Sequence, residues 1–315
     1  TEVYVDKQNE MAGYQAIELC IDVVSVGNPT LPAPAPLVLI EAALKCGQSL
    51  LAGGNATVQK GLAKKLPSKP SDAFYLAARE YLRGREHSLV HEREMRKKGT
   101  IVDEDGTQAF SNHVIEFLRL WCEGHNLEMQ DLLRVQEDNK KEINLIDQVC
   151  SLTSTIACDA SVLRGMEQDE LEELNLHLEF YAEILQGPCV GNQNFLALST
   201  VMPETLKRIL ISKIHKPGQN ETKTVGMVRA ACCKIFAAML EGGDDLNVMG
   251  VIVDVLDSES IRIIIREVYT RCQEIETDKK TPMAKNPELA AEYDALLSCG
   301  YDIMSVLMQI KDLCL

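Results

Sequence analysis

Apolar residues at helical spacing are the feature that most constrains how this chain can fold. In the segment DELEELNLHLEFYAEILQGP, residues Leu171, Leu174, Leu178, Tyr181 and Leu185 follow one another at steps of three and four. One face of an α-helix repeats with that spacing, whereas a half-buried strand alternates with a period of two. The helical pattern recurs along most of the chain, and no convincing alternating pattern accompanies it. The sequence therefore predicts an all-α fold of amphipathic helices.

Glycine and proline divide the pattern into separate helices. One such stop follows the helix that begins at residue 37, where Gly53 and Gly54 can take the left-handed conformation common beyond helix ends. The helices are expected over residues 6–26, 37–52, 55–66, 72–98, 111–121, 127–135, 143–163, 169–186, 194–215, 222–241, 245–256, 258–275 and 287–314. Many helices joined by short turns predict stacked antiparallel pairs in an armadillo-like superhelix.

The stops also predict an order of sections. PTLPAPAP contains four prolines, which remove backbone donors and favour an extended linker. The predicted sections are an N-terminal helix (1–28), the proline-rich linker (29–36), a helical section with a long polar helix (37–98), a loop (99–109), a larger helical domain (110–275) and a C-terminal helical section (276–315).

Charge and hydropathy limit the function classes. The net charge of −15 argues against a general nucleic-acid binder, because phosphate contacts need clustered Lys and Arg. Residues 60–98 are the exception, with eleven basic and five acidic side chains and a net charge of +6. This basic section is either a solvated helix face, which is favoured, or a surface that contacts an acidic neighbour. No apolar run reaches the roughly 20 residues of a membrane span, and no signal peptide begins the chain. We expect a soluble segment without membrane contact of its own, and the start at Thr1 and the apolar DLCL end fit a piece of a longer polypeptide.

The stretch WCEGHN, residues 121–126, interrupts a helical pattern and has two interpretations. Cys122 and His125 lie three residues apart and could form a thiol–imidazole pair, although no third orienting residue is evident. Alternatively, Gly124 ends one helix in a left-handed conformation, Asn126 caps the next, and Glu128 lies favourably near the positive end of its dipole. The second interpretation is favoured, so the stretch is predicted to be a corner, with His125 held by packing or hydrogen bonding.

The other chemical candidates are weak. His87 and His91 have the i, i+4 spacing of a metal pair but lack the adjacent glutamate of HExxH, and DEDGT fails as a calcium loop because Ile101 and Asn112 would occupy ligand positions. The eleven cysteines have no regular spacing, which favours buried free thiols in a reducing compartment. We therefore expect no catalytic, cofactor-binding or metal site, and no enzymatic activity.

Four segments resemble one known family, three of them closely and one more weakly. FLRLWCEGHNLEMQDLLRVQ (117–136) and FYAEILQGPCVGNQNFLA (180–197) resemble shared motifs of the inositol trisphosphate and ryanodine receptors, in their receptor homology-associated region. SLLAGGNATVQKGL (49–62) resembles a further segment of that family, and residues 234–269 resemble it more weakly. The likeness covers most of residues 37–275 in outline. The short loop over 99–109 and the absence of an EF-hand pair favour the inositol trisphosphate receptor, whereas VDEDGT and CEGHN are slightly closer to the ryanodine type.

The resemblance implies a cytosolic regulatory part of a ligand-gated calcium-release channel, which is a tetramer in the endoplasmic reticulum membrane. Neither a ligand-binding core nor a pore occurs in these residues. The implied partners are neighbouring domains of the same channel and adjacent subunits, and the implied role is to pass ligand-induced motion toward the pore. Two alternatives stay open: a free armadillo-like adaptor that binds a partner peptide, and, more remotely, an enzyme using Cys122.

Overall fold

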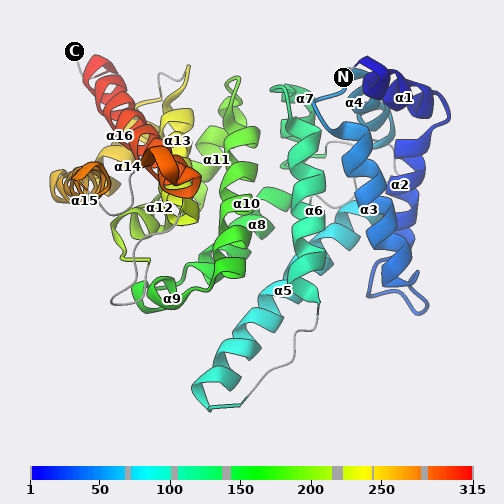
Figure 1. Cartoon of the computed structure of the whole chain (residues 1–315). Coiled ribbons are helices and arrows are strands. Elements are labelled where there is room, and N and C mark those ends of the chain that lie inside the picture. Colours follow the sequence, from blue (N-terminus) through cyan, green and yellow to red (C-terminus); the bar gives the residue numbers. More distant parts are fainter. Residues whose placement is uncertain are drawn as a thin grey trace. The chain divides into compact units, whose positions relative to one another are not determined.

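All regular secondary structure in the described part of the protein is helical. The computed structural model describes residues 2–67, 72–100, 106–136, 143–214, 223–242, 245–277 and 283–313. Within these ranges it has sixteen α-helices, one 3-10 helix and no strand (Figure 1). The predicted all-α class is therefore confirmed. The armadillo-like superhelix stays a prediction, with which the paired packing of helices inside each unit is compatible.

The chain divides into two compact units, Thr1–Thr155 and Ile156–Leu315. In the first unit α2 packs on α3 and α5, and α6 packs on α3 and α5, so that these four helices enclose one apolar core. Its helices are α1 (Glu2–Gly13), α2 (Ala16–Val26), α3 (Leu37–Leu51), α4 (Ala56–Lys65), α5 (Asp72–Lys97), α6 (Thr107–Cys122), α7 (Leu127–Leu132) and α8 (Leu145–Ile156), the last of which ends at the boundary between the units.

The core of the first unit is partly aromatic. Trp121 stacks on Phe74 with ring centroids 5.2 Å apart and meets Phe117 edge-on at 5.6 Å. All three side chains are at most 1% exposed. Gly47 on α3 lies against the ring of Phe117, where an added Cβ would be only 2.4 Å from Cε2. The absence of a side chain at Gly47 therefore allows α3 and α6 to approach.

The N-terminal prediction is wrong in one respect. The helix expected over 6–26 is two helices, because Gln15 has a left-handed φ of 58° and ends the first one. Met11 and Tyr14 are exposed as a result, while Ile17 in the first turn of α2 is buried. The long polar helix is confirmed as α5, whose C-terminal end extends beyond the neighbouring helices of its unit (Figure 1).

The second unit is built around α13. The helix α10 packs on one part of its surface and α16 on another, and α13 with α16 forms the most extensive helix contact among the described elements. The elements are α9 (Ala160–Gly165), α10 (Gln168–Leu185), α11 (Val190–Ser199), α12 (Met202–Ile211), α13 (Lys223–Leu240), α14 (Leu246–Val255), α15 (Ser258–Thr277), η2 (Met283–Lys285) and α16 (Pro287–Leu313).

Two further predicted helices are also divided, one at the boundary between the units and one within the second unit. The helix expected over 143–163 is α8 and α9, because Asp159 caps a new helix by accepting from the amides of Ser161 and Val162. The helix expected over 194–215 is α11 and α12, with Pro203 in the first turn of the second, where its missing amide hydrogen costs nothing. The buried stripe on α10 is confirmed, since all five predicted apolar residues are buried.

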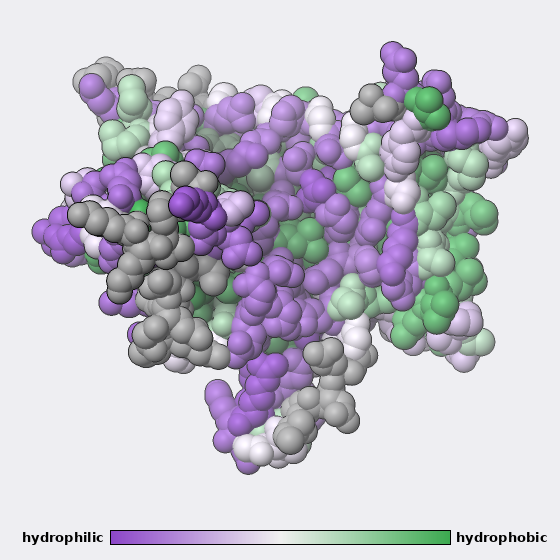
Figure 2. Space-filling model, in the orientation of Figure 1, coloured by the Kyte–Doolittle hydropathy of each residue, from purple (hydrophilic) through white to green (hydrophobic). Residues whose placement is uncertain are grey.

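An apolar patch lies on the surface of the first unit. Figure 2 shows apolar side chains gathered over α2 and α3, at the right of the view. They include Leu19 and Val26 on α2, which are 63% and 55% exposed, and Val38 at the start of α3, which is 79% exposed. Contiguous apolar surface of this kind is typical of a protein interaction site.

Candidate functional site: two glutamine-capped corners

The first corner, residues 121–126, joins α6 to α7. The helix α6 ends at Cys122, after which Gly124 has φ 82° and His125 has φ 61°. The side chain of Asn126 then accepts from the Met129 amide at 3.3 Å and begins α7. The predicted corner is therefore confirmed, with its glycine stop and its asparagine cap. His125 differs from the expectation, since it is exposed and its position follows from the left-handed backbone.

Gln59 on α4 connects the first corner to a distant segment. Its Nε2 donates to the carbonyl oxygens of Trp121, at 3.1 Å, and Glu123, at 2.8 Å. Its Oε1 accepts from Asn126 Nδ2 at 3.2 Å. The last carbonyls of a helix have no partner within the helix, so a buried amide that donates to them satisfies groups that burial would otherwise penalise. Gln59 is 4% exposed, and it thus caps the end of α6 from outside.

The glycine-rich turn before α4 completes this contact. The Gly53 amide donates to Glu123 Oε2 at 3.2 Å. Gly54 has φ 67°, and an added Cβ there would lie 3.0 Å from the Glu123 carbonyl oxygen. Asn55 caps α4 through the amides of Thr57 and Val58. Two of the family-like segments, 49–62 and 117–136, therefore contact each other directly.

The second corner, residues 186–193, follows α10. Gly187 has φ 93°, and Asn192 Nδ2 donates to the Ile184 carbonyl at 3.0 Å, near the end of α10. Gln193 Nε2 donates to the carbonyls of Ala238, at 2.7 Å, and Glu241, at 3.0 Å, where α13 ends. Gln193 is 1% exposed. It caps α13 from α11 in the same way as Gln59 caps α6 from α4.

A glycine again permits close contact at the second corner. Gly242 follows α13 with φ 65°, and an added Cβ would be 2.6 Å from Pro188 Cγ. The similar strings LLAGGN and LEGGDD thus both follow or include the end of a helix. Their roles differ, because LLAGGN precedes the capping residue Gln59 along the chain, whereas LEGGDD includes a carbonyl that Gln193 caps. This difference agrees with a shared helix stop and does not establish a repeat.

The competing chemical candidates are not assembled into a site. Cys122 is fully buried on α6, whereas His125 is exposed on the turn. His87 and His91 are both exposed on α5. In the ranges that the structure describes, no group of three His, Cys, Asp or Glu side chains could hold a metal ion. Residues 101–105, which include most of DEDGT and Ile101, lie outside those ranges.

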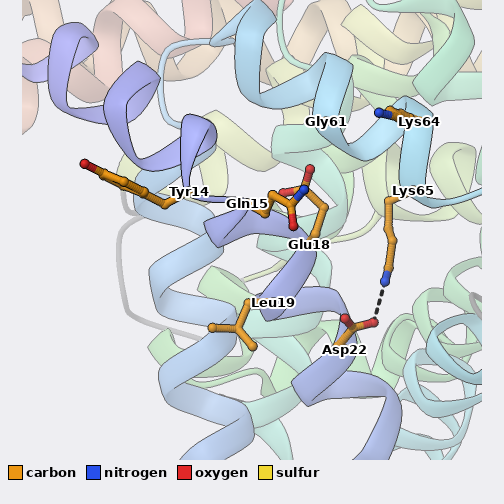
Figure 3. Close-up of a pocket in the computed structure, with 8 residues that line it drawn as sticks. All are labelled: Tyr14, Gln15, Glu18, Leu19, Asp22, Gly61, Lys64 and Lys65. Carbon is orange, nitrogen blue, oxygen red and sulfur yellow. Dashed lines mark ion pairs between the residues drawn. The ribbon is translucent and has the colours of Figure 1, made fainter.

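A polar cavity of about 540 Å³ lies in the first unit beside α2 and α4 (Figure 3). Glu18 and Asp22 come from α2, and Lys64 and Lys65 from the end of α4. Lys65 Nζ is 2.7 Å from Asp22 Oδ1, so one charge of the basic 60–98 section is paired within its own unit. Sequence reasoning did not predict this cavity, because its charges come from helices 40 residues apart.

The charges of α5 are also partly paired within the helix. Arg85 is 2% exposed, and its Nη1 lies 3.0 Å from Glu92 Oε1. Arg79 Nη2 lies 2.9 Å from Glu80 Oε1, and Arg83 Nη1 lies 3.6 Å from the same oxygen. Exposed basic side chains of this section lie both on α4, at Lys60 and Lys64, and at the end of α5, at Lys97 and Lys98.

In the described ranges, no helix combines the length and apolar character needed to cross a bilayer.

Comparisons with known proteins agree with the motif resemblance. Residues 106–210, from the start of α6 into α12, match the family described as "RyR and IP3R Homology associated". The chain is 25% identical over 137 residues to the inositol 1,4,5-trisphosphate receptor itr-1 of Caenorhabditis elegans, an alignment that covers 42% of this chain and 5% of that receptor. The chain thus spans only a small part of the length of the relative it matches. Both corners lie within the matched region, and that region is similar to the inositol trisphosphate and ryanodine receptors.

Proposed function

We propose that this chain is a cytosolic regulatory region of a ligand-gated calcium-release channel, and that it passes ligand-induced motion toward the pore. The observation that carries the proposal is that both corners fall in the segment matching the family, and that a glutamine amide joins each of them to a helix outside that segment. Packed helices move as rigid bodies and shift discretely against their neighbours, so helices joined firmly at their ends can carry displacement over distance. The proposed location of the channel is the endoplasmic reticulum membrane, with this chain on the cytosolic side.

The apolar patch on the first unit supports the proposal that this chain contacts other domains of the same channel. The apolar patch over α2 and α3 fits contact with another folded domain, because exposed apolar area of that kind is usually covered in an assembly. In the proposed tetramer the covering surface belongs to a neighbouring domain of the same subunit or to an adjacent subunit. No nucleic acid and no enzymatic step is part of the proposal.

Gln59→Ala is the variant that tests the proposal. Truncating Trp121 is less suitable, since removing a fully buried tryptophan costs about 3–5 kcal/mol and endangers folding. Removing the Gln59 amide leaves the core intact and frees the carbonyls of Trp121 and Glu123, at a cost of about 1–3 kcal/mol. Lys60→Ala is the matched control, because Lys60 is the next residue of α4 and is exposed.

The measurement is calcium release by the full-length channel that contains these residues, expressed in cells lacking other channels of the family. We expect Gln59→Ala to assemble and to bind inositol trisphosphate as the parent does, but to open less at each ligand concentration. Lys60→Ala should behave like the parent. Unchanged gating in Gln59→Ala, with normal assembly, would contradict the proposed transmission.

A further inference from the structure

Two thiols from different helices of the second unit are in contact. Cys233 on α13 and Cys299 on α16 are both fully buried, with their Sγ atoms 3.6 Å apart. They lie 66 residues apart in the sequence. A disulfide needs an S–S distance of about 2.05 Å, so bond formation requires an approach of about 1.5 Å. Rotation about two side-chain bonds and a slight shift of one helix can supply a movement of this size.

The packing of α16 on α13 brings the thiols together. Gly226 on α13 faces Ala295 on α16, where an added Cβ would lie 3.2 Å from the Ala295 Cβ. Small residues at such a crossing let the helix backbones approach closely. The cysteines follow the same faces two turns further along α13 and about one turn further along α16. The thiol contact is therefore a consequence of the largest helix interface in the unit.

Burial protects the thiols of Cys233 and Cys299 from oxidation while α16 is packed on α13. The hydrogen bond with Cys299 and then burial raise the pKa of the Cys233 thiol well above its usual range. Burial likewise raises the pKa of the neighbouring Cys232. Because the thiolate is the attacking species in disulfide exchange, oxidation needs a local opening that admits solvent and reagent. The rate of oxidation of the two thiols therefore depends on how often α16 separates from α13.

We propose that Cys233 and Cys299 form a redox modification site, at which a low-molecular-weight disulfide such as oxidised glutathione generates an intrachain disulfide between α13 and α16. One protein thiolate attacks a sulfur of glutathione disulfide, which forms a mixed disulfide and releases one glutathione. The second protein thiolate attacks the protein sulfur of the mixed disulfide and releases the other glutathione. Two protein thiols are oxidised, one glutathione disulfide is reduced, and the two thiol protons pass to the released glutathiones.

The bond would hold α16 on α13. It would close a loop that contains α14, α15 and η2, and cross-linking a loop of this length restricts the unfolded chain. The oxidised chain should accordingly melt at a temperature several degrees higher than the reduced chain. Separation of α16 from α13, which the reduced chain can undergo, would be prevented.

Peptide mapping of the chain tests the proposal. The parent for the test carries serine at the exposed Cys46 and Cys158 and at Cys314, so that intermolecular disulfides do not compete. After incubation with oxidised glutathione, free thiols are alkylated and the chain is digested with trypsin. We expect peptide AACCK (230–234) to be linked to the peptide 286–311 that contains Cys299, with the loss of two hydrogens. The same sample should show the raised melting temperature.

Single variants identify the sulfur atoms. Cys233→Ser and Cys299→Ser should each abolish the link, whereas Cys232→Ser, at the adjacent position in the same peptide, should retain it. Fragmentation of the linked parent peptide assigns the bond to Cys233 or Cys232 directly, so the assignment does not depend on how a variant folds. Absence of the link in the parent, a bond to Cys232, or formation at the same rate in urea-unfolded chain would each overturn the proposal.

Discussion

At the scale of single residues, buried amide side chains satisfy the ends of helices. Gln59 and Gln193 each donate to two carbonyls at the end of a helix to which they do not themselves belong. The cap at Asn126 could be predicted, because an N-cap and its amide partner lie three residues apart. The glutamine caps could not, because Gln59 lies 62 residues from Trp121 and Gln193 lies 45 from Ala238. An amide on the apolar face of a short helix was the available signal, and it names no partner.

His113 gives a residue-scale prediction for pH. Burial and then Lys45 lower its pKa below the ordinary value, outweighing the opposite effects of Glu41 and Glu116. Below about pH 6.5 the unfolded chain therefore takes up the proton more readily than the folded chain. His113 costs no stability above that pH and destabilises the unit progressively as the pH falls through it.

His113→Gln should remove this penalty. Urea unfolding between pH 7.5 and pH 5 should show similar stabilities of parent and variant at the upper end. The stability of the variant relative to the parent should then increase as the pH falls below about 6.5, the ordinary histidine pKa. His125→Gln, at the exposed corner histidine, is the control. A parent that becomes more stable relative to His113→Gln as the pH falls would show that attraction to Glu41, 3.6 Å away, outweighs burial.

At the scale of helices, the apolar pattern predicted nearly all elements, and its errors have one physical origin. The helices expected over 6–26, 143–163 and 194–215 each proved to be two. Their periodicity continues across the breaks, while a left-handed Gln15, a capping Asp159 and Pro203 in a first turn interrupt the backbone. Apolar periodicity reports which face is buried and does not report whether the axis is continuous. Capping chemistry sets the boundaries.

The packing of α3 on α6 gives a prediction at this scale. Alanine is favoured over glycine inside a helix by about 1 kcal/mol. Gly47→Ala should nevertheless destabilise the chain by about 1–3 kcal/mol, because the new Cβ would overlap the buried ring of Phe117.

Gly84→Ala on α5 is the matched control for that variant. An added Cβ at Gly84 meets no atom within 4 Å, so helix preference alone should stabilise the chain by about 0.5–1 kcal/mol. Urea denaturation of both variants measures the two effects. Two changes of the same sign would mean that Phe117 yields to the added methyl group and that the close approach of α3 and α6 is not tightly fixed.

At the scale of the whole molecule, the sequence predicted the fold class and the family resemblance but not the division into units. The motifs at 117–136 and 180–197 pointed to the same family that residues 106–210 match, and these motifs include the residues that build the two corners. The division into units at residue 155 was not predicted, since it depends on contacts between distant helices and no linker composition marks it. The sections predicted from the sequence, and the armadillo-like stacking, stay predictions. Each unit contains one of the two corners, and in each unit a buried glutamine amide caps the end of a helix.

Hydrogen exchange of the second unit measures whether the contact of Gln193 with the end of α13 holds that unit together as one rigid body. In Gln193→Ala the carbonyls of Ala238 and Glu241 lose the buried amide donor, which should lower the free energy of opening by about 1–3 kcal/mol. We expect an equal loss of protection for the core amides of α10 and α13, with Asn194→Ala, the next residue of α11, close to the parent. A loss confined to the last turn of α13, or no loss at all, would contradict rigid-body behaviour.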